Sequence, residues 1–187
     1  GHVYNLPAPF FVLATQNPVE QEGTYPLPEA QVDRFFMKVE VDYPGFDDEK
    51  EIITRMTEGA VLRTGEVLSA QAILKAQKFV DGIYVSETLK EYIVHLVSAT
   101  RNPGKYQLEK LAPLIEYGAS PRASIGLTVA AKARAFLDGR GYATPDDVKA
   151  LAADVMRHRL ILTYEGEAQN LSADDVISQI LGKVPVP

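Results

Sequence analysis

The sequence changes character near Tyr43-Pro44-Gly45, and this change limits the possible folds more than any other feature. Before it, residues 1–45 hold half of the twelve prolines together with short strand-like runs. After it, the signals that start and end helices recur along the chain. We therefore predict two parts: an α/β remnant at residues 1–45 and an all-α bundle at residues 46–187.

Two segments of residues 1–45 have the patterns of β-strands. Residues 10–15 form a nearly continuous apolar run, which is typical of a strand buried on both faces of a parallel sheet. Residues 35–42 alternate apolar and polar side chains, as in a half-buried strand nearer a sheet edge. Two strands cannot bury a core by themselves, and the chain begins with Gly1 rather than Met. We therefore expect the rest of the sheet upstream, in a longer protein.

Residues 46–187 predict a compact bundle of five or six helical elements. Ser120-Pro121 and Thr144-Pro145 each place proline at the first helical position after a capping residue. The type of structure at residues 105–119 and 160–162 stays open. The predicted helix starts are Asp47 or Asp48, Ser69, Ser86, Ser120, Thr144 and Ser172, and the predicted ends lie near Gly59, Gly82, Asn102, Gly139 and Gly182.

Composition excludes several classes of function. The 19 Lys and Arg residues against 25 Asp and Glu give a net charge of -6, which argues against a protein that coats duplex DNA. Cysteine is absent, which excludes disulfides, thiolate metal ligands and thiol catalysis. The three histidines, His2, His95 and His158, lack the spacing of metal ligands. No run approaches the roughly 20 apolar residues of a membrane span and no secretory signal is visible, so we expect a cytoplasmic protein.

Three polar residues stand out at the ends of predicted elements. Asn17 ends the predicted buried strand, Arg34 ends a short predicted helix, and Arg122 lies in the first turn of the helix that starts at Ser120. An arginine is poorly placed for the dipole at a helix start, unless it meets an anion such as phosphate.

Each of the three has a plainer interpretation. Asn17-Pro18 is a common turn signal, Arg34 has the setting of an ordinary ion-pair residue, and Arg122 could pair with an acid on the helical part. The run Arg157-His158-Arg159 is interpreted as the basic end of a helix, where it favours the dipole.

Two stretches together resemble MoxR-type AAA+ proteins. The run ATQNP–EGTYPLPEAQVDRF at residues 14–35 resembles the second half of their ATPase core, and GASPRAS at residues 118–124 resembles their lid domain, as does Arg157-His158-Arg159. The resemblance covers essentially the whole chain. It implies the C-terminal strands of a P-loop NTPase sheet followed by a helical lid. It also implies roles for Asn17 as sensor 1, Arg34 as arginine finger and Arg122 as the nucleotide-binding sensor 2.

The same resemblance implies an ATPase that uses ATP and Mg²⁺ to remodel or mature a protein partner, in the manner of a chaperone. It implies a ring, commonly a hexamer, and a partner that carries a von Willebrand factor A-like domain. The sequence lacks the GxxxxGK[ST] phosphate loop and the acidic magnesium motif. We therefore assign no metal ligand here and expect this chain alone to be inactive. Two alternatives stay open, a non-enzymatic helical interaction module and a fragment of a related nucleic-acid motor; the acidic charge argues against the second.

Overall fold

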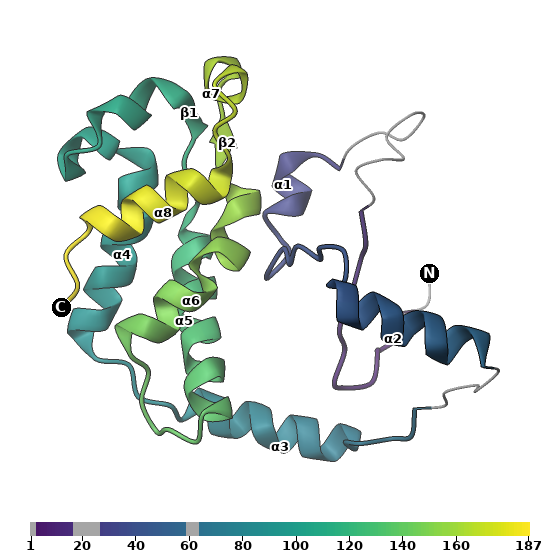
Figure 1. Cartoon of the computed structure of the whole chain (residues 1–187). Helices are drawn as coiled ribbons and strands as arrows, with labels where there is room; N and C mark the ends of the chain where they lie inside the picture. Colours follow the sequence, from purple (N-terminus) through teal and green to yellow (C-terminus); the bar gives the residue numbers. More distant parts are fainter. Residues whose placement is uncertain (1–2, 17–26, 59–63) are drawn as a thin grey trace.

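The computed structural model describes residues 3–16, 27–58 and 64–187 (Figure 1). Its described elements, in chain order, are α1 (Glu29–Val32), α2 (Phe46–Thr57), α3 (Ala70–Asp81), α4 (Glu87–Arg101), the 3-10 helices η2 (Pro103–Tyr106) and η3 (Glu109–Leu114), β1 (Ile115–Tyr117), α5 (Pro121–Leu137), α6 (Pro145–Met156), the 3-10 helix η4 (Arg157–Arg159), β2 (Ile161–Leu162), α7 (Tyr164–Ala168) and α8 (Ala173–Lys183).

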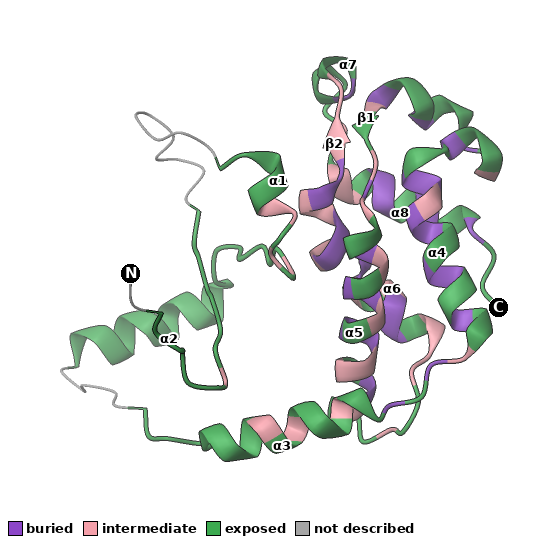
Figure 2. Ribbon diagram, turned by 180° about the vertical axis from the view of Figure 1, so that it is seen from behind, coloured by how far each residue is buried: buried purple, intermediate pink, exposed green. Residues whose placement is uncertain are grey.

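One hydrophobic core lies within residues 83–184, which we call the helical body. Helices α4, α5, α6 and α8 turn their buried faces toward one another, as the purple segments of Figure 2 show. Leu96, Leu127, Val148 and Val176 are each 0% exposed in this core. The predicted helical bundle is therefore confirmed for this part of the chain.

Most of the capping residues predicted from the sequence begin the helices, but α2 begins at Phe46 after Gly45, ahead of the predicted Asp47 or Asp48. The side chains of Ser69, Ser86, Ser120 and Ser172 each accept a backbone N–H at the start of α3, α4, α5 and α8. Gly139, just after α5, has a φ of 71°, a conformation that glycine adopts without steric cost. These signals are local, which is why the sequence alone located the helices.

The two segments that the sequence left open pair with each other. Residues 105–119 contain η2, η3 and β1, and residues 160–162 contain β2. The two strands are antiparallel, with Ile115 opposite Leu162. This small ribbon leads the chain from β1 into Gly118 and the start of α5.

The N-terminal part differs from the prediction in its strands. Residues 10–15 are exposed and form no strand, and residues 35–42 form none either. A strand is stable only when its backbone pairs with neighbouring strands, and neither described strand pairs with these segments. Helix α2 lies away from the core, and neither α2 nor α3 has a buried residue (Figures 1 and 2). The boundary between residues 45 and 46 stays a prediction.

Among the helices that the structure describes, none combines the length and apolar character needed to cross a membrane.

Candidate functional site at the junction of the two parts

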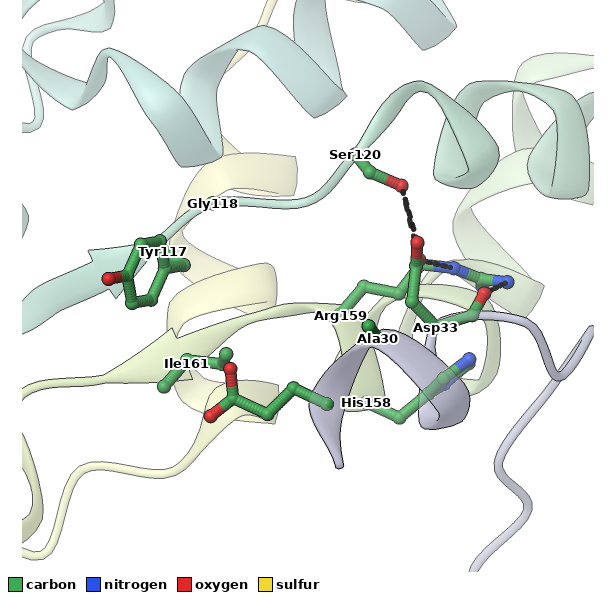
Figure 3. A pocket seen from close by; sticks show the side chains of 9 residues that line it. Ala30, Asp33, Tyr117, Gly118, Ser120, His158, Arg159 and Ile161 are labelled. Carbon is green, nitrogen blue, oxygen red and sulfur yellow. Dashed lines mark hydrogen bonds and ion pairs between the residues drawn. The ribbon is translucent and has the colours of Figure 1, made fainter. Parts of the chain in front are cut away.

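The carboxylate of Asp33 is the centre of the contact between the N-terminal part and the helical body. Asp33 directly follows α1. Its two oxygens each lie 3.1 Å from Ser120 Oγ, which donates to them, and Arg159 Nε donates to Oδ1 at 3.0 Å (Figure 3). Arg122 Nε lies 3.7 Å from Oδ2. Asp33, the residue before Arg34, is thus bound through its carboxylate to the start of α5.

Arg159 is buried, with a side chain only 3% exposed. Besides the Asp33 carboxylate, its guanidinium donates to the backbone carbonyls of Asp33 and Phe36, both at 3.2 Å, and to that of Phe35. It also donates to the carbonyl of Val155 near the end of the preceding helix, α6. Burial lowers the pKa of Arg159, while Asp33 opposes this shift and Arg122 adds to it. A buried guanidinium needs its donors satisfied, and the segment around Arg34 supplies most of the acceptors.

The two preceding residues also contact the N-terminal part. His158 Nε2 lies 3.1 Å from the carbonyl oxygen of Phe35. Arg157 holds Asp174 with two nitrogens, at 3.0 and 2.8 Å, and donates to the carbonyl of Lys38 at 2.8 Å. The sequence predicted that the run Arg157-His158-Arg159 is only the basic end of a helix. In the structure the run has a further role. All three side chains bind the backbone of residues 33–38.

The surroundings of His158 favour its neutral form. A carbonyl only accepts, so Nε2 carries the proton, and Nδ1 is buried with no partner among the described residues. Burial lowers the pKa of His158, and the neighbouring charge of Arg159 lowers it further. A proton on Nδ1 would find no acceptor, which favours the neutral ring.

Arg122 lies where the sequence predicted, in the first turn of α5, and its side chain is 49% exposed. Its contact with Asp33 is loose at 3.7 Å, because the carboxylate is already bound by Ser120 and Arg159. Two guanidinium groups thus face one carboxylate. The two positive charges exceed the single negative charge of Asp33. The excess positive charge lies on the exposed Arg122, where it can bind an anion. The alternative interpretation was that Arg122 pairs with an acid of the helical part. The acid beside Arg122 is instead Asp33 of the N-terminal part.

Arg34 is exposed immediately after Asp33, and no acid among the described residues lies within 4.0 Å of it. The structure therefore brings the neighbourhoods of Arg34 and Arg122 together through Asp33. Asn17 lies outside the described residues.

A hollow of about 180 Å³, open to solvent, lies beside this junction (Figure 3). Gly118 on its wall lets the chain pass close to the end of α4: a Cβ there would lie 2.6 Å from the carbonyl oxygen of Thr100. Thr100 Oγ1 also accepts the N–H of Ala119 at 2.9 Å. These contacts fix where Ser120, and with it α5, begins. The hollow is lined by Glu29, Ala30, Asp33, Tyr117, Gly118, Ser120, His158, Arg159 and Ile161.

Within residues 3–16, 27–58 and 64–187, no cluster of three or more His, Asp or Glu side chains is placed to hold a metal ion. We assign no magnesium ligand among these described residues.

Sequence reasoning missed Asp33 and Arg159 as members of this site. Asp33 stands beside Arg34 in the predicted motif, and Arg159 is the last of three consecutive basic residues followed by an apolar run. The signal that could have found them is a basic residue beside an apolar run, since a buried arginine demands an acid partner.

Two family models match the chain. A model of the ATPase family associated with various cellular activities (AAA) matches residues 1–37, and a model of the AAA lid domain matches residues 109–180. The helical body thus contains the segment that matches a lid.

Curated relatives match along the chain. It is 42% identical over 187 residues to Chaperone MoxR1 of Mycobacterium tuberculosis, covering 100% of this chain and 49% of that protein. It is 39% identical over 188 residues to YeaC of Bacillus subtilis, an uncharacterized protein, covering 100% and 56%. Protein MoxR of Paracoccus denitrificans is 32% identical, with 94% and 56% covered. The chain spans about half the length of these relatives.

A solved structure has the same fold. The crystal structure of a protein from Cytophaga hutchinsonii, whose assignment as an ATPase is provisional, superposes with a TM-score of 0.93 at 46% identity. The superposition covers 98% of this chain and 56% of that one. The predicted fold class, part of an AAA+ core followed by a helical lid, is confirmed. Along essentially its whole length, the chain is therefore similar to part of the MoxR-type AAA+ proteins.

Proposed function

We propose that this chain is the C-terminal portion of an ATPase unit that couples ATP binding and hydrolysis to remodelling or maturation of a protein partner. The observation that carries the proposal is the junction at Asp33. It places an exposed arginine, Arg34, next to a carboxylate bonded to the helix start that carries a second, half-exposed arginine, Arg122. Each of these exposed guanidinium groups can bind a phosphate group, and the Asp33 carboxylate links the positions of the two.

In this proposal the three predicted residues keep separate roles. Arg122 binds the phosphates of ATP in its own subunit, and its loose contact with Asp33 leaves it free to do so. Arg34 acts as an arginine finger in the site of a neighbouring subunit, where its charge stabilises phosphoryl transfer. Asn17 orients the attacking water, because an amide can both donate and accept hydrogen bonds. The phosphate loop and the magnesium ligands come from other sequence, so the 187-residue chain alone should show only background ATP turnover.

A finger that serves a neighbour requires assembly, so we propose a ring, which in this family is commonly a hexamer. The partner is a protein, for which a von Willebrand factor A-like domain is the family expectation, and the site of action is the cytoplasm. The relative named Chaperone MoxR1 supports a chaperone-like role.

The test is the turnover of a longer protein in which this chain is joined to its phosphate loop. Arg34→Ala should lower kcat by about 10³–10⁵, the range for an arginine finger, and leave ATP binding intact. Mixed with a variant that lacks the phosphate-loop lysine, it should recover part of the activity, because some interfaces then pair an intact site with an intact finger. Arg122→Ala should instead reduce the rise in melting temperature that ATP causes.

Arg55→Ala is the matched control, because it removes an exposed arginine whose ion-pair partner among the described residues is Glu51 of the same helix. It should leave turnover and ATP binding unchanged. Normal turnover in Arg34→Ala, or mixed rings that demonstrably form but never recover activity, would refute the finger role.

A further inference from the structure

The contacts of Arg159 lead to a second role at the junction. We propose that Arg159 of the helical body is a positioning residue for Arg34: it fixes the backbone on both sides of Arg34 and so sets where that side chain projects. This inference rests on the proposed role of Arg34 as an arginine finger, but its structural part can be tested without that role.

The acceptors of Arg159 bracket Arg34 in the sequence. On one side they are the carboxylate and the carbonyl of Asp33, at 3.0 and 3.2 Å. On the other side they are the carbonyls of Phe35 and Phe36. Arg34 itself takes no part and stays exposed. A residue whose neighbours on both sides are held can rotate its side chain about its own bonds, but its Cα has little freedom to shift, and this is what positions the side chain for catalysis.

The guanidinium of Arg159 is closely surrounded. At Gly126 of α5, an added Cβ would lie 3.0 Å from Val155 Cγ1 and at the ordinary contact distance of 3.9 Å from both Arg159 Nη1 and Phe36 Cε2. Lysine would keep the positive charge, but a single ammonium cannot reach acceptors spread over three residues. Arg159→Lys therefore removes the bracketing and keeps the charge.

The anchoring joins Arg34 to the nucleotide-facing residue of the same subunit. The Asp33 carboxylate that Arg159 holds also accepts from Ser120 and lies near Arg122. A movement of the α5 start on nucleotide binding would act directly on the residue preceding Arg34. The position of the helical body thereby becomes a determinant of the geometry at a neighbour's site.

A purely structural ion pair would explain the burial of Arg159 without any effect on Arg34. The chain offers a matched comparison in Arg140, which donates to both oxygens of the buried Asp147, at 2.8 and 2.6 Å, and to Asp138 and the carbonyl of Tyr142. Like Arg159, Arg140 binds a carboxylate and makes several hydrogen bonds, but it makes none to residues 33–38. Arg140→Lys should destabilise the body without disturbing Arg34.

The experiment uses the 187-residue chain, in which the absence of cysteine makes a single introduced thiol a unique labelling site. A nitroxide is attached through Arg34→Cys, and its mobility is measured by electron paramagnetic resonance. A label at Glu91→Cys, exposed on α4, is the reference position. We expect Arg159→Lys to increase the mobility at position 34 and not at position 91, and Arg140→Lys to change neither. Unchanged mobility in Arg159→Lys, or an equal increase in Arg140→Lys, overturns the proposal.

If Arg159→Lys does not fold, Asp33→Asn carries the same test, because it keeps the shape of the side chain and removes the charge that Arg159 binds. It should increase mobility at position 34 in the same direction but by less, and no increase overturns the proposal.

Turnover in the longer protein separates this inference from the proposed function. There Arg159→Lys should lower kcat by up to about 100-fold, the scale of loss from a misplaced catalytic group, and leave the KM for ATP unchanged. If Arg34→Ala has no effect on turnover, the finger role fails while the mobility result stands. If Arg34→Ala impairs turnover but Arg159→Lys does not, the positioning role fails alone.

Discussion

The helical body and the N-terminal part contain similar apolar side chains but bury them to very different extents. Leu96 and Val97 on α4 are 0% exposed, whereas Phe11 and Leu13 are each 80% exposed. Both pairs come from runs that the sequence predicts to be buried. The difference shows that an apolar run is buried only where other apolar side chains pack against it. Among the described residues, only the helical body provides such packing.

Residues 33–38 are the exception within the N-terminal part. Their backbone is bound by Arg157, His158 and Arg159, and the N–H of Lys38 donates to the carbonyl of Asp154 at 2.8 Å. Met37 packs against the core. The contrast is therefore between a segment held by hydrogen bonds to the helical body and a run, residues 10–15, without such contacts.

The largest effect should come from truncating equal side chains in the two regions. Leu96→Ala removes a fully buried side chain and should lower the free energy of unfolding by about 2–5 kcal/mol. Leu13→Ala should change it by no more than about 0.5 kcal/mol, as for other exposed sites. Urea denaturation of the 187-residue chain measures both, and equal losses would contradict the contrast in burial.

A smaller loss is expected where the chain enters the junction. A Cβ at Gly118 would lie 2.6 Å from both the carbonyl oxygen of Thr100 and Cγ of Arg101. Because the first is backbone, Gly118→Ala should cost about 1–3 kcal/mol, the range for overpacking. Gly104→Ala is the control, since no atom lies within 4 Å of its added Cβ. If the two variants unfold alike, the close approach at Gly118 has no energetic consequence.

These two regions also show how far the sequence could predict the structure. Helix starts were found because a cap such as Ser86 and the N–H it accepts are three residues apart. The strands predicted at residues 10–15 and 35–42 are not formed, because a strand needs backbone partners from other segments and its own sequence cannot supply them. The role of Arg159 was invisible for a similar reason: its acceptor Asp33 lies 126 residues away. The position of Arg122 at a helix start was predictable, but the acid beside it was not.

Caps should separate the helical body from α3 on a finer scale. Ser86 caps α4, which has seven buried residues, whereas Ser69 caps α3, which has none. Ser86→Ala should lower the free energy of unfolding by about 1 kcal/mol, the usual value for a lost cap. Ser69→Ala should speed amide exchange within α3 and leave the unfolding midpoint of the helical body nearly unchanged, because α3 contributes little to the core. A shift of that midpoint equal to the one in Ser86→Ala would place α3 in the same cooperative unit.

The smallest effect concerns pH and the contact of His158 with the N-terminal part. Burial and the charge of Arg159 lower the pKa of His158 in the folded chain, so below the ordinary histidine pKa of about 6.5 the unfolded state binds a proton that the folded state does not. Stability should therefore decrease as pH falls from 7.5 to 5.5. His158→Gln cannot take up a proton and should flatten this slope, as urea denaturation across the range would show.

Carboxylates do not contribute to the slope between pH 7.5 and 5.5. Hydrogen bonds from Arg140 and Thr144 outweigh burial and lower the pKa of Asp147, and ordinary Asp and Glu titrate near pH 4. Exchange of the Lys38 amide should quicken over the same interval in the unmodified chain, since a charged imidazole would leave the Nδ1 proton without an acceptor beside Arg159. A slope that persists in full in His158→Gln would mean that another group senses the pH and that this histidine is not part of what holds the two regions together.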